Sequence, residues 1–249
     1  MSDFYLTLPS NSSMHHYPEN SPSDFITELP KPIDLKTNNY EVGLAEIQYP
    51  NTYTNLDEGW IRLKLGNRTE EINLPRGLYD SPSTLVNVLN SCLTDFNPSN
   101  YKTECDINFS YNKSTRLATI DIKTKECEIE LSPEISDMLG MNGYCMIGPH
   151  KYVSRVMCDV HKHSNAMYVY CNIVEMRQVG DMLVPLLRIL PAHNKSIDVI
   201  HHLFEKPHYI PLNRYQFNNI EILLRTDTGR KLAFLSGTSV VTLHFRVRK

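Results

Sequence analysis

Apolar and polar residues alternate with a period of two in short segments along most of the chain. Because successive side chains of a strand point to opposite faces of its sheet, this alternation predicts strands with one buried face. The clearest segment is 241–247, in which the odd-numbered residues are apolar and the even-numbered residues are polar. Clusters of Asn, Pro, Gly and Ser separate the segments, and this spacing is typical of an antiparallel sandwich or barrel.

The alternation predicts about eleven strands, and 241–247 is one of them. The others span residues 23–29, 40–48, 61–65, 106–111, 118–122, 127–131, 167–174, 185–190, 199–205 and 220–225. The polar run 123–125 separates two of these strands, 118–122 and 127–131. Such a short connection predicts that these two strands form a hairpin.

Two segments have helical spacing instead. A serine and a proline at 81–82 stand ahead of apolar residues that recur every three to four positions, which predicts a helix over 81–96. A second Ser-Pro pair at 132–133 begins a shorter segment of this kind, and Gly140 ends it. The second helix is expected to have about two turns.

Nothing in the sequence marks a boundary between domains. We find no Pro/Ser-rich linker and no internal repeat, so residues 23–249 are expected to form one domain. Residues 1–22 contain few apolar residues and many Asn, Ser and Pro residues. They are expected to form an arm that is either mobile or ordered only against a partner.

Composition and charge exclude several classes of protein. The chain of 249 residues is 41% hydrophobic and 21% charged, which is typical of a globular protein, and its net charge of -3 does not favour binding to nucleic acid by bulk charge. No apolar run reaches the about 18 residues that a membrane-spanning helix needs, and no secretory signal is recognisable. A reducing compartment and free thiols are therefore expected for the six cysteines.

Candidate chemistry is sparse. His161 and His163 would share one face of a strand, a spacing with which some metal sites begin. A cupin-type metal enzyme would add a glutamate three or four residues later, but the next acidic residue is Glu175. The chain also lacks a G-x-S-x-G motif and a phosphate-binding glycine loop. The sequence therefore predicts no enzyme and no cofactor, and His161 and His163 are the metal candidates to be tested.

Several segments, taken in order along the chain, resemble one family of proteins. They span residues 4–13, 17–25, 29–35 and 40–47, and then 179–181, 185–189, 206–212, 220–222, 227–230 and 241–246. Together they resemble the minor capsid (penton) proteins of Maverick/Polinton elements and their adintovirus relatives, some of which are found in animal genomes as transposon-derived products. Each segment is short, but the ordered set covers nearly the whole chain.

The resemblance implies an all-β fold, a single jelly-roll sandwich of two antiparallel sheets with one or two short helices in connections. It implies a structural virion protein that is assembled inside the host cell, forms homopentamers at the fivefold vertices of an icosahedral shell and contacts a double-jelly-roll major capsid protein. A host receptor is a further partner that outer loops could contact, and no membrane partner is expected.

The resemblance also marks two sets of residues. Those in the family motifs, expected to be structural, are Gly180, Asp181, Pro207, His208, Tyr209, Pro211 and Gly229. The candidates for assembly contacts are Phe4, Tyr5, Tyr17, Arg246, Arg248 and Lys249. The last three form the basic end of the chain, which is the one expected place for a contact with nucleic acid. Two alternatives stay open: a cell-surface or carbohydrate-binding β-sandwich, and, less favoured, a cupin-type metal enzyme.

Overall fold

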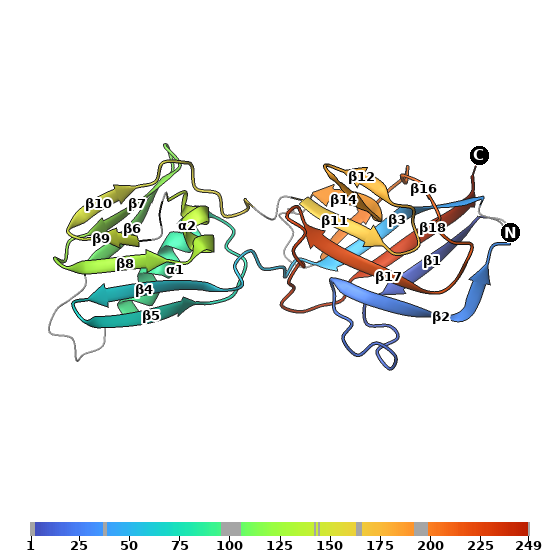
Figure 1. The fold of residues 1–249 in the computed structure, drawn as a ribbon, viewed down its shortest axis with the longest axis horizontal. Coiled ribbons are helices and arrows are strands. Elements are labelled where there is room, and N and C mark those ends of the chain that lie inside the picture. The colour runs from blue at the N-terminus through green and yellow to red at the C-terminus, as the bar shows by residue number, and fades with distance from the viewer. Residues whose placement is uncertain are drawn as a thin grey trace. The chain divides into compact units, whose positions relative to one another are not determined.

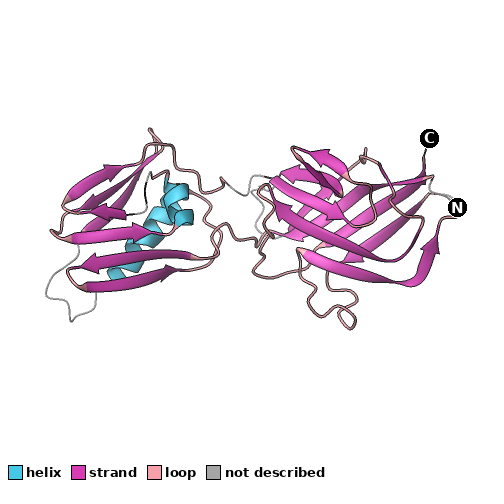
Figure 2. Cartoon of the chain, viewed as in Figure 1, coloured by secondary structure: helices cyan, strands magenta, loops and turns pink. Residues whose placement is uncertain are grey.

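The computed structural model describes residues 3–36, 39–95, 106–141, 143, 145–162, 166–191 and 199–248. The described residues form eighteen strands and two helices, so the fold is all-β, as expected (Figures 1 and 2). Neither helix in these residues is long and apolar enough to cross a membrane.

The chain divides into two compact units. Unit 1 comprises residues 1–53 and 163–249, and unit 2 comprises residues 54–162. One domain was expected over 23–249, whereas this range contains two units, the second inserted into the first. The alternation of apolar residues identifies strands but not which strands share a core, and no Pro/Ser-rich linker marks the junctions.

Unit 1 is a jelly-roll-like sandwich of two antiparallel sheets. Across the first sheet, the strand order is β1 (Phe4–Pro9), β18 (Val240–Val247), β3 (Tyr40–Pro50) and β15 (Val199–Leu203), and β16 (Ile210–Pro211) also pairs with β3. Across the second, the order is β14 (Leu186–Pro191), β11 (Ala166–Cys171), β17 (Gln216–Thr226) and β2 (Asp24–Asp34). Between the sheets, the ring of Phe217 stacks on that of Phe245 with centroids 6.0 Å apart.

The alternation in the last strand is confirmed. Val241, Leu243 and Phe245 have no exposed surface, while the polar residues between them lie on the outer face of β18. Val247, at the end of the strand, is 40% exposed.

Residues 3–22 do not form the separate arm that their composition predicted. β1 pairs with β18 over six residues, and Leu8 is only 1% exposed. The segment after β1 is also attached, because the Asn20 amide donates to the carbonyl oxygens of Ser12 and Ile26 at 3.0 and 2.9 Å. The apolar residues of β1 are few but alternate correctly, so a low apolar content concealed a strand that completes a sheet.

Unit 2 has its own core between two further antiparallel sheets. The four-stranded sheet contains β5 (Arg68–Leu74), β4 (Gly59–Leu65), β8 (Cys127–Leu131) and β9 (Cys145–Ile147). The three-stranded sheet contains β10 (His150–Val153), β7 (Leu117–Ile122) and β6 (Ile107–Asn112). Helices α1 (Pro82–Asp95) and α2 (Pro133–Leu139) contribute Leu85, Leu89 and Ile135, all fully buried, to this core.

The expected hairpin of 118–122 with 127–131 is wrong. β7 pairs with β6 and β10, whereas β8 pairs with β4 and β9, so the two strands belong to different sheets. Their buried faces are as expected, since Ile120 and Ile129 are fully buried. The polar connection crosses from one sheet to the other, and Glu126 in it has a φ of 57°. Local alternation fixes the face of a strand but not its partner.

Both expected helices are present. α1 covers the expected helix except for Ser81, which directly precedes it, and Phe96, which lies outside the described residues. α2 begins after Ser132, whose Oγ accepts a hydrogen bond from the Ile135 backbone N–H at 3.4 Å. It ends at Gly140, which has the left-handed φ of 69° that glycine adopts without strain.

Candidate assembly surfaces of the sandwich

The motif 206–212 packs against a glycine of the first sheet. β16 pairs with the start of β3, with Ile210 opposite Val42. A Cβ atom at Gly43 would lie 2.8 Å from Cβ of Pro207, 3.1 Å from the His208 carbonyl oxygen and 3.3 Å from Cδ1 of Tyr209. Only a glycine leaves room for this approach, so the motif is held to β3 by pairing and by shape.

Pro211 and His208 have different surroundings in the same motif. Pro211 is opposite Glu41 in the pairing with β3 and is half-buried. The His208 side chain is exposed, and its backbone carbonyl is the part that faces Gly43.

Three aromatic side chains form a cluster on the outer face of the first sheet. The Tyr5 ring, on β1, stacks on the His244 ring of β18 with centroids 4.3 Å apart. Nδ1 of His244 lies 2.7 Å from the Tyr209 hydroxyl oxygen, and the two rings meet edge to face. Tyr5 is 63% exposed, whereas the His244 side chain is only 14% exposed. The structure thus brings together Tyr5, an assembly candidate, and Tyr209, a motif residue.

Arg246 is engaged within the chain. Its Nε lies 2.6 Å from Oε1 of Glu41, and its guanidinium carbon lies 3.3 Å from the centroid of the Tyr209 ring. Burial raises the pKa of the Tyr209 hydroxyl, and the charge of Arg246 opposes this rise. The guanidinium of Arg246 is therefore paired with a carboxylate of β3 and stacked on a tyrosine.

The other assembly candidates are separate from this cluster. Phe4 is half-buried, and its ring stacks on that of the buried Phe245 with centroids 4.7 Å apart. Arg248 is exposed, and its backbone N–H donates to the Asn39 carbonyl oxygen at 2.9 Å. Lys249 lies outside the described residues.

Tyr17 lies beside an open hollow of about 440 Å³ on the second sheet. Its hydroxyl donates to Oε2 of Glu28 at 2.9 Å, and this hydrogen bond raises the pKa of Tyr17. Asn20 also lines this hollow, and both ends of its side-chain amide form hydrogen bonds within the chain. The nitrogen donates to two backbone carbonyls, and the oxygen accepts from a backbone N–H. A groove for sugars offers free amides beside aromatic rings, whereas here these polar groups are already bonded.

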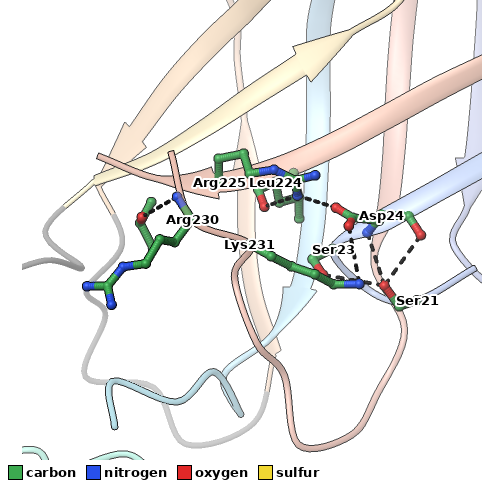
Figure 3. A network of polar contacts seen from close by, with 8 residues as sticks. Ser21, Ser23, Asp24, Leu224, Arg225, Arg230 and Lys231 are labelled. Atoms are coloured by element: carbon green, nitrogen blue, oxygen red, sulfur yellow. Dashed lines mark hydrogen bonds and ion pairs between the residues drawn. The ribbon is translucent and has the colours of Figure 1, made fainter. Parts of the chain in front are cut away.

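A polar network closes one end of the second sheet (Figure 3). Asp24 at the start of β2 forms ion pairs with Arg225 of β17 and with Lys231, the latter at 3.2 Å. The backbone N–H of Asp24 donates to the Ser21 hydroxyl at 3.2 Å. The chain turns back between these cations at Gly229, which has a φ of 79°. Gly229 thus lies in the turn between two members of the network. Asp24 and its two cations are too far apart in sequence for a local pattern to reveal their pairing.

The motif that contains Gly180 and Asp181 forms the tip of a small hairpin. β12 (Arg177–Val179) and β13 (Met182–Val184) form a two-stranded sheet that turns at Gly180, with a φ of 62°, and Asp181. Met182 is 62% exposed and Leu183 is 71% exposed, although adjacent residues of a strand point to opposite faces. Each face of this hairpin therefore exposes one large apolar side chain.

Of the two metal candidates, only His161 belongs to the residues that the structure describes. Nε2 of His161 lies 3.2 Å from the Asp80 carbonyl oxygen, and His163 lies outside the part of the chain that the structure describes. Among the residues that are described, no group of three or more His, Cys, Asp or Glu side chains could hold a metal ion.

Arg188 is a candidate contact residue that the sequence patterns did not reveal. It lies on the edge strand β14, and its guanidinium carbon is 3.7 Å from the centroid of the Phe204 ring, just after the edge strand β15. Nη1 of Arg188 is buried without a hydrogen-bond partner among the described residues, and burial lowers the pKa of this group. The signal that could have revealed it is the single charge within the apolar run 186–190.

Comparison with known proteins identifies the fold. No family model matches the chain, and no curated protein matches its sequence. Among solved structures, the penton protein of mavirus, crystallised in selenomethionine form, aligns with 99% of this chain and 100% of its own, at 12% identity and a TM-score of 0.50. An alignment at this identity shows a shared fold, and it spans both units. The chain therefore has a penton-like, all-β fold.

Proposed function

We propose that this chain is a penton subunit: a minor capsid protein that forms homopentamers at the fivefold vertices of an icosahedral shell. The observation that carries the proposal is the alignment of nearly the whole chain with the whole of a viral penton protein. The sequence resemblance to the penton proteins of Maverick/Polinton elements and adintoviruses supports it independently. In this role the protein is a component of the virion, and its mechanism is assembly rather than catalysis.

Exposed apolar side chains support a role that involves protein partners. Met176, Met182 and Leu183 in and beside the β12/β13 hairpin are each more than 60% exposed. A two-stranded hairpin is marginally stable on its own in water, so burial against another protein would stabilise it. We assign this hairpin to contacts with the double-jelly-roll major capsid protein.

The outer aromatic cluster is a second contact candidate. Tyr5 is largely exposed and stacks on His244, which Tyr209 contacts in turn. A rigid, exposed tyrosine buries a large area on binding at a small cost in conformational entropy. Arg248 and Lys249 are left as the residues for any contact with enclosed nucleic acid, since Arg246 is paired with Glu41.

The alternative of a carbohydrate-binding or cell-surface sandwich has less support. Its best site is the hollow beside Tyr17, where the Asn20 amide is already bonded within the chain. A vertex protein that presents outer loops to a host receptor would combine both roles. The cupin alternative would need further metal ligands beside His161. Among the described residues, no group of three or more His, Cys, Asp or Glu side chains could hold a metal ion there.

Co-assembly with the major capsid protein tests the proposal. Particles formed with both proteins would be imaged by electron cryomicroscopy, and native mass spectrometry would measure the oligomer of this chain released from them. We expect density for five copies at each fivefold vertex and a pentameric mass. A double variant, Met182→Asp with Leu183→Asp, is expected to keep the monomer folded and to lower its incorporation into particles. Density for this chain at threefold or twofold axes, or vertices filled without it, contradicts the proposal.

A further inference from the structure

The two edges of the sandwich in unit 1 differ in charge. β14 and β15 are end strands of the two sheets, and they share one edge because Arg188 of β14 stacks on Phe204 just after β15. β1 and β2 are the other two end strands and share the opposite edge, where Ser12 after β1 is hydrogen-bonded to Thr27 of β2 (Figure 1). Segments 177–191 and 199–208, which contain β14 and β15, have three Lys/Arg residues and two carboxylates. Segment 3–36, which contains β1 and β2, has five carboxylates and two lysines. The net charges are thus +1 and -3.

The cations of the β14/β15 edge lack ion-pair partners among the described residues. Arg177, Arg188 and Lys206 form no ion pair with any carboxylate in this part of the chain. Arg188 is the most constrained of them, because its guanidinium is stacked on Phe204 and no described residue bonds its buried Nη1. A buried donor without an acceptor is unfavourable, and a carboxylate that reached it would remove this cost.

Exposed apolar side chains lie on the same two edge strands as Arg188. Ile189 follows it on β14 and is 46% exposed, and Leu203, directly before Phe204, is 69% exposed. Val199 at the start of β15 is 53% exposed. An edge that combines an arginine with exposed apolar side chains has the composition that protein interfaces favour.

Within the described residues, most carboxylates of the β1/β2 edge also lack a Lys or Arg partner. Of Asp3, Glu19, Asp24, Glu28 and Asp34, only Asp24 pairs with a Lys or Arg among the residues described. Glu28 accepts hydrogen bonds from Tyr17 and Asn218, and the Asp3 side chain is 60% exposed. One edge therefore offers carboxylates and the other offers a guanidinium that lacks one.

We propose that the β14/β15 edge of one copy docks on the β1/β2 edge of the next copy, and that Arg188 there receives a carboxylate from segment 3–36. The inference rests on the proposed function, since a closed ring needs two different, complementary edges on each subunit. The occupant is a second copy of this chain because both halves of the complementary pair are present on one molecule.

The contact is made by side chains rather than by a continuous sheet. β2 carries Pro30 and Pro32, and β14 ends at Pro191. Proline has no backbone N–H to donate, so it prevents strand addition along an edge. Charge and shape, rather than main-chain pairing, then determine which copies join.

The first test separates assembly from folding. Arg188→Met removes the guanidinium nitrogens and retains an apolar stem over Phe204, so the melting temperature of the dilute monomer is expected to stay unchanged. Arg188→Glu places a carboxylate opposite carboxylates and is expected to raise the concentration at half-assembly by about tenfold or more. Arg155→Glu, at an exposed arginine of unit 2, is the matched control. It is expected to change the concentration at half-assembly by less than about twofold. A lower melting temperature for Arg188→Met with unchanged assembly assigns Arg188 to folding alone and overturns the inference.

The second test maps the partner surface directly. A photo-crosslinking residue replaces Leu203, and a mixture of isotope-labelled and unlabelled full-length chains is irradiated both at high concentration and in assembled particles. Peptides from 3–36 of a second copy are the expected products, and a probe at Leu235, on the loop before β18, is expected to yield none. Products from the β14/β15 edge itself, from another protein only, or from no second copy in either sample overturn the inference. Fivefold density without such products would leave the proposed function intact, whereas the absence of fivefold density would remove both.

Discussion

Gly43 illustrates how one residue without a side chain allows a whole segment to pack. Gly43→Ala puts a Cβ atom 2.8 Å from Cβ of Pro207, so the segment 206–212 must move away from β3. The backbone of Gly43 is not in the left-handed region, so the effect is one of space. We expect a loss of about 1–3 kcal/mol in the free energy of unfolding, measured with denaturant. Gly77→Ala, where no atom lies within 4 Å of the new Cβ, is the control, and an equal loss there would contradict this account.

His202 makes the stability of the sandwich dependent on pH. Its Nε2 lies 3.3 Å from the Tyr49 hydroxyl oxygen, and its ring stacks on Phe204. Burial first, and the neighbouring His201 second, lower the pKa of His202. The unfolded chain then binds the proton more readily, so stability is present above about pH 6.5 and is lost as pH falls below it.

Melting temperatures across this range test the assignment to His202. His202→Gln can still bond Tyr49 but does not titrate, so the fall in melting temperature on acidification should become shallower. The same substitution at the exposed His208 is the control. If the melting temperatures of both variants fall as steeply on acidification as that of the unchanged protein, a group other than His202 causes the pH dependence.

Among the elements, β1 is the one whose role differs most from its expected role. Leu8→Ala is expected to cost about 2–5 kcal/mol of unfolding free energy, because Leu8 is 1% exposed in a strand that completes the first sheet. Thr7→Ala, one position earlier on the exposed face, should cost far less. A mobile arm would make both substitutions neutral, and denaturant unfolding distinguishes the two cases.

Local patterns predicted the elements better than their pairing. Most strands of five or more residues, such as 241–247, were found because the alternation of apolar and polar residues is local, but β1 and β5 were missed. Shorter ones, such as β12 and β16, have too few residues to show a period. β7 forms a hairpin with the preceding strand β6 instead, and β8 pairs with β4, which is far away in the chain. Alternation alone does not distinguish these partners, and this is why the hairpin of β7 with β8 was wrongly expected.

The same distinction applies to the candidate surfaces. The motif 206–212 was visible as a sequence, and the structure gives it a place on β3. The stacking of Arg188 on Phe204 and the ion pairs of Asp24 were not visible, because each joins residues from different elements. A sequence alone supplies residues with suitable chemistry, and only the fold shows which of them lie together.

At the scale of the whole molecule, unit 2 is built so that its two ends meet. The Asn55 amide donates to the carbonyl oxygens of Tyr79 and Val160 at 2.9 and 2.8 Å. It thereby joins the first residues of unit 2 to its last ones, since this unit spans 54–162. An insertion whose ends lie close together can enter the connection between two strands without separating them.

Unit 2 is therefore expected to fold without the sandwich. A fragment of residues 54–162 keeps every residue of its own core, from Leu56 to Val160. It should unfold cooperatively on heating, show helical circular dichroism from α1 and α2, and give dispersed amide signals in NMR spectra. Asn55→Ala in the fragment leaves two carbonyl groups without their donor and should lower its melting temperature, while Asn73→Ala, at an exposed position of β5, should not. A fragment without a cooperative transition would mean that the core of unit 2 depends on the sandwich for its stability.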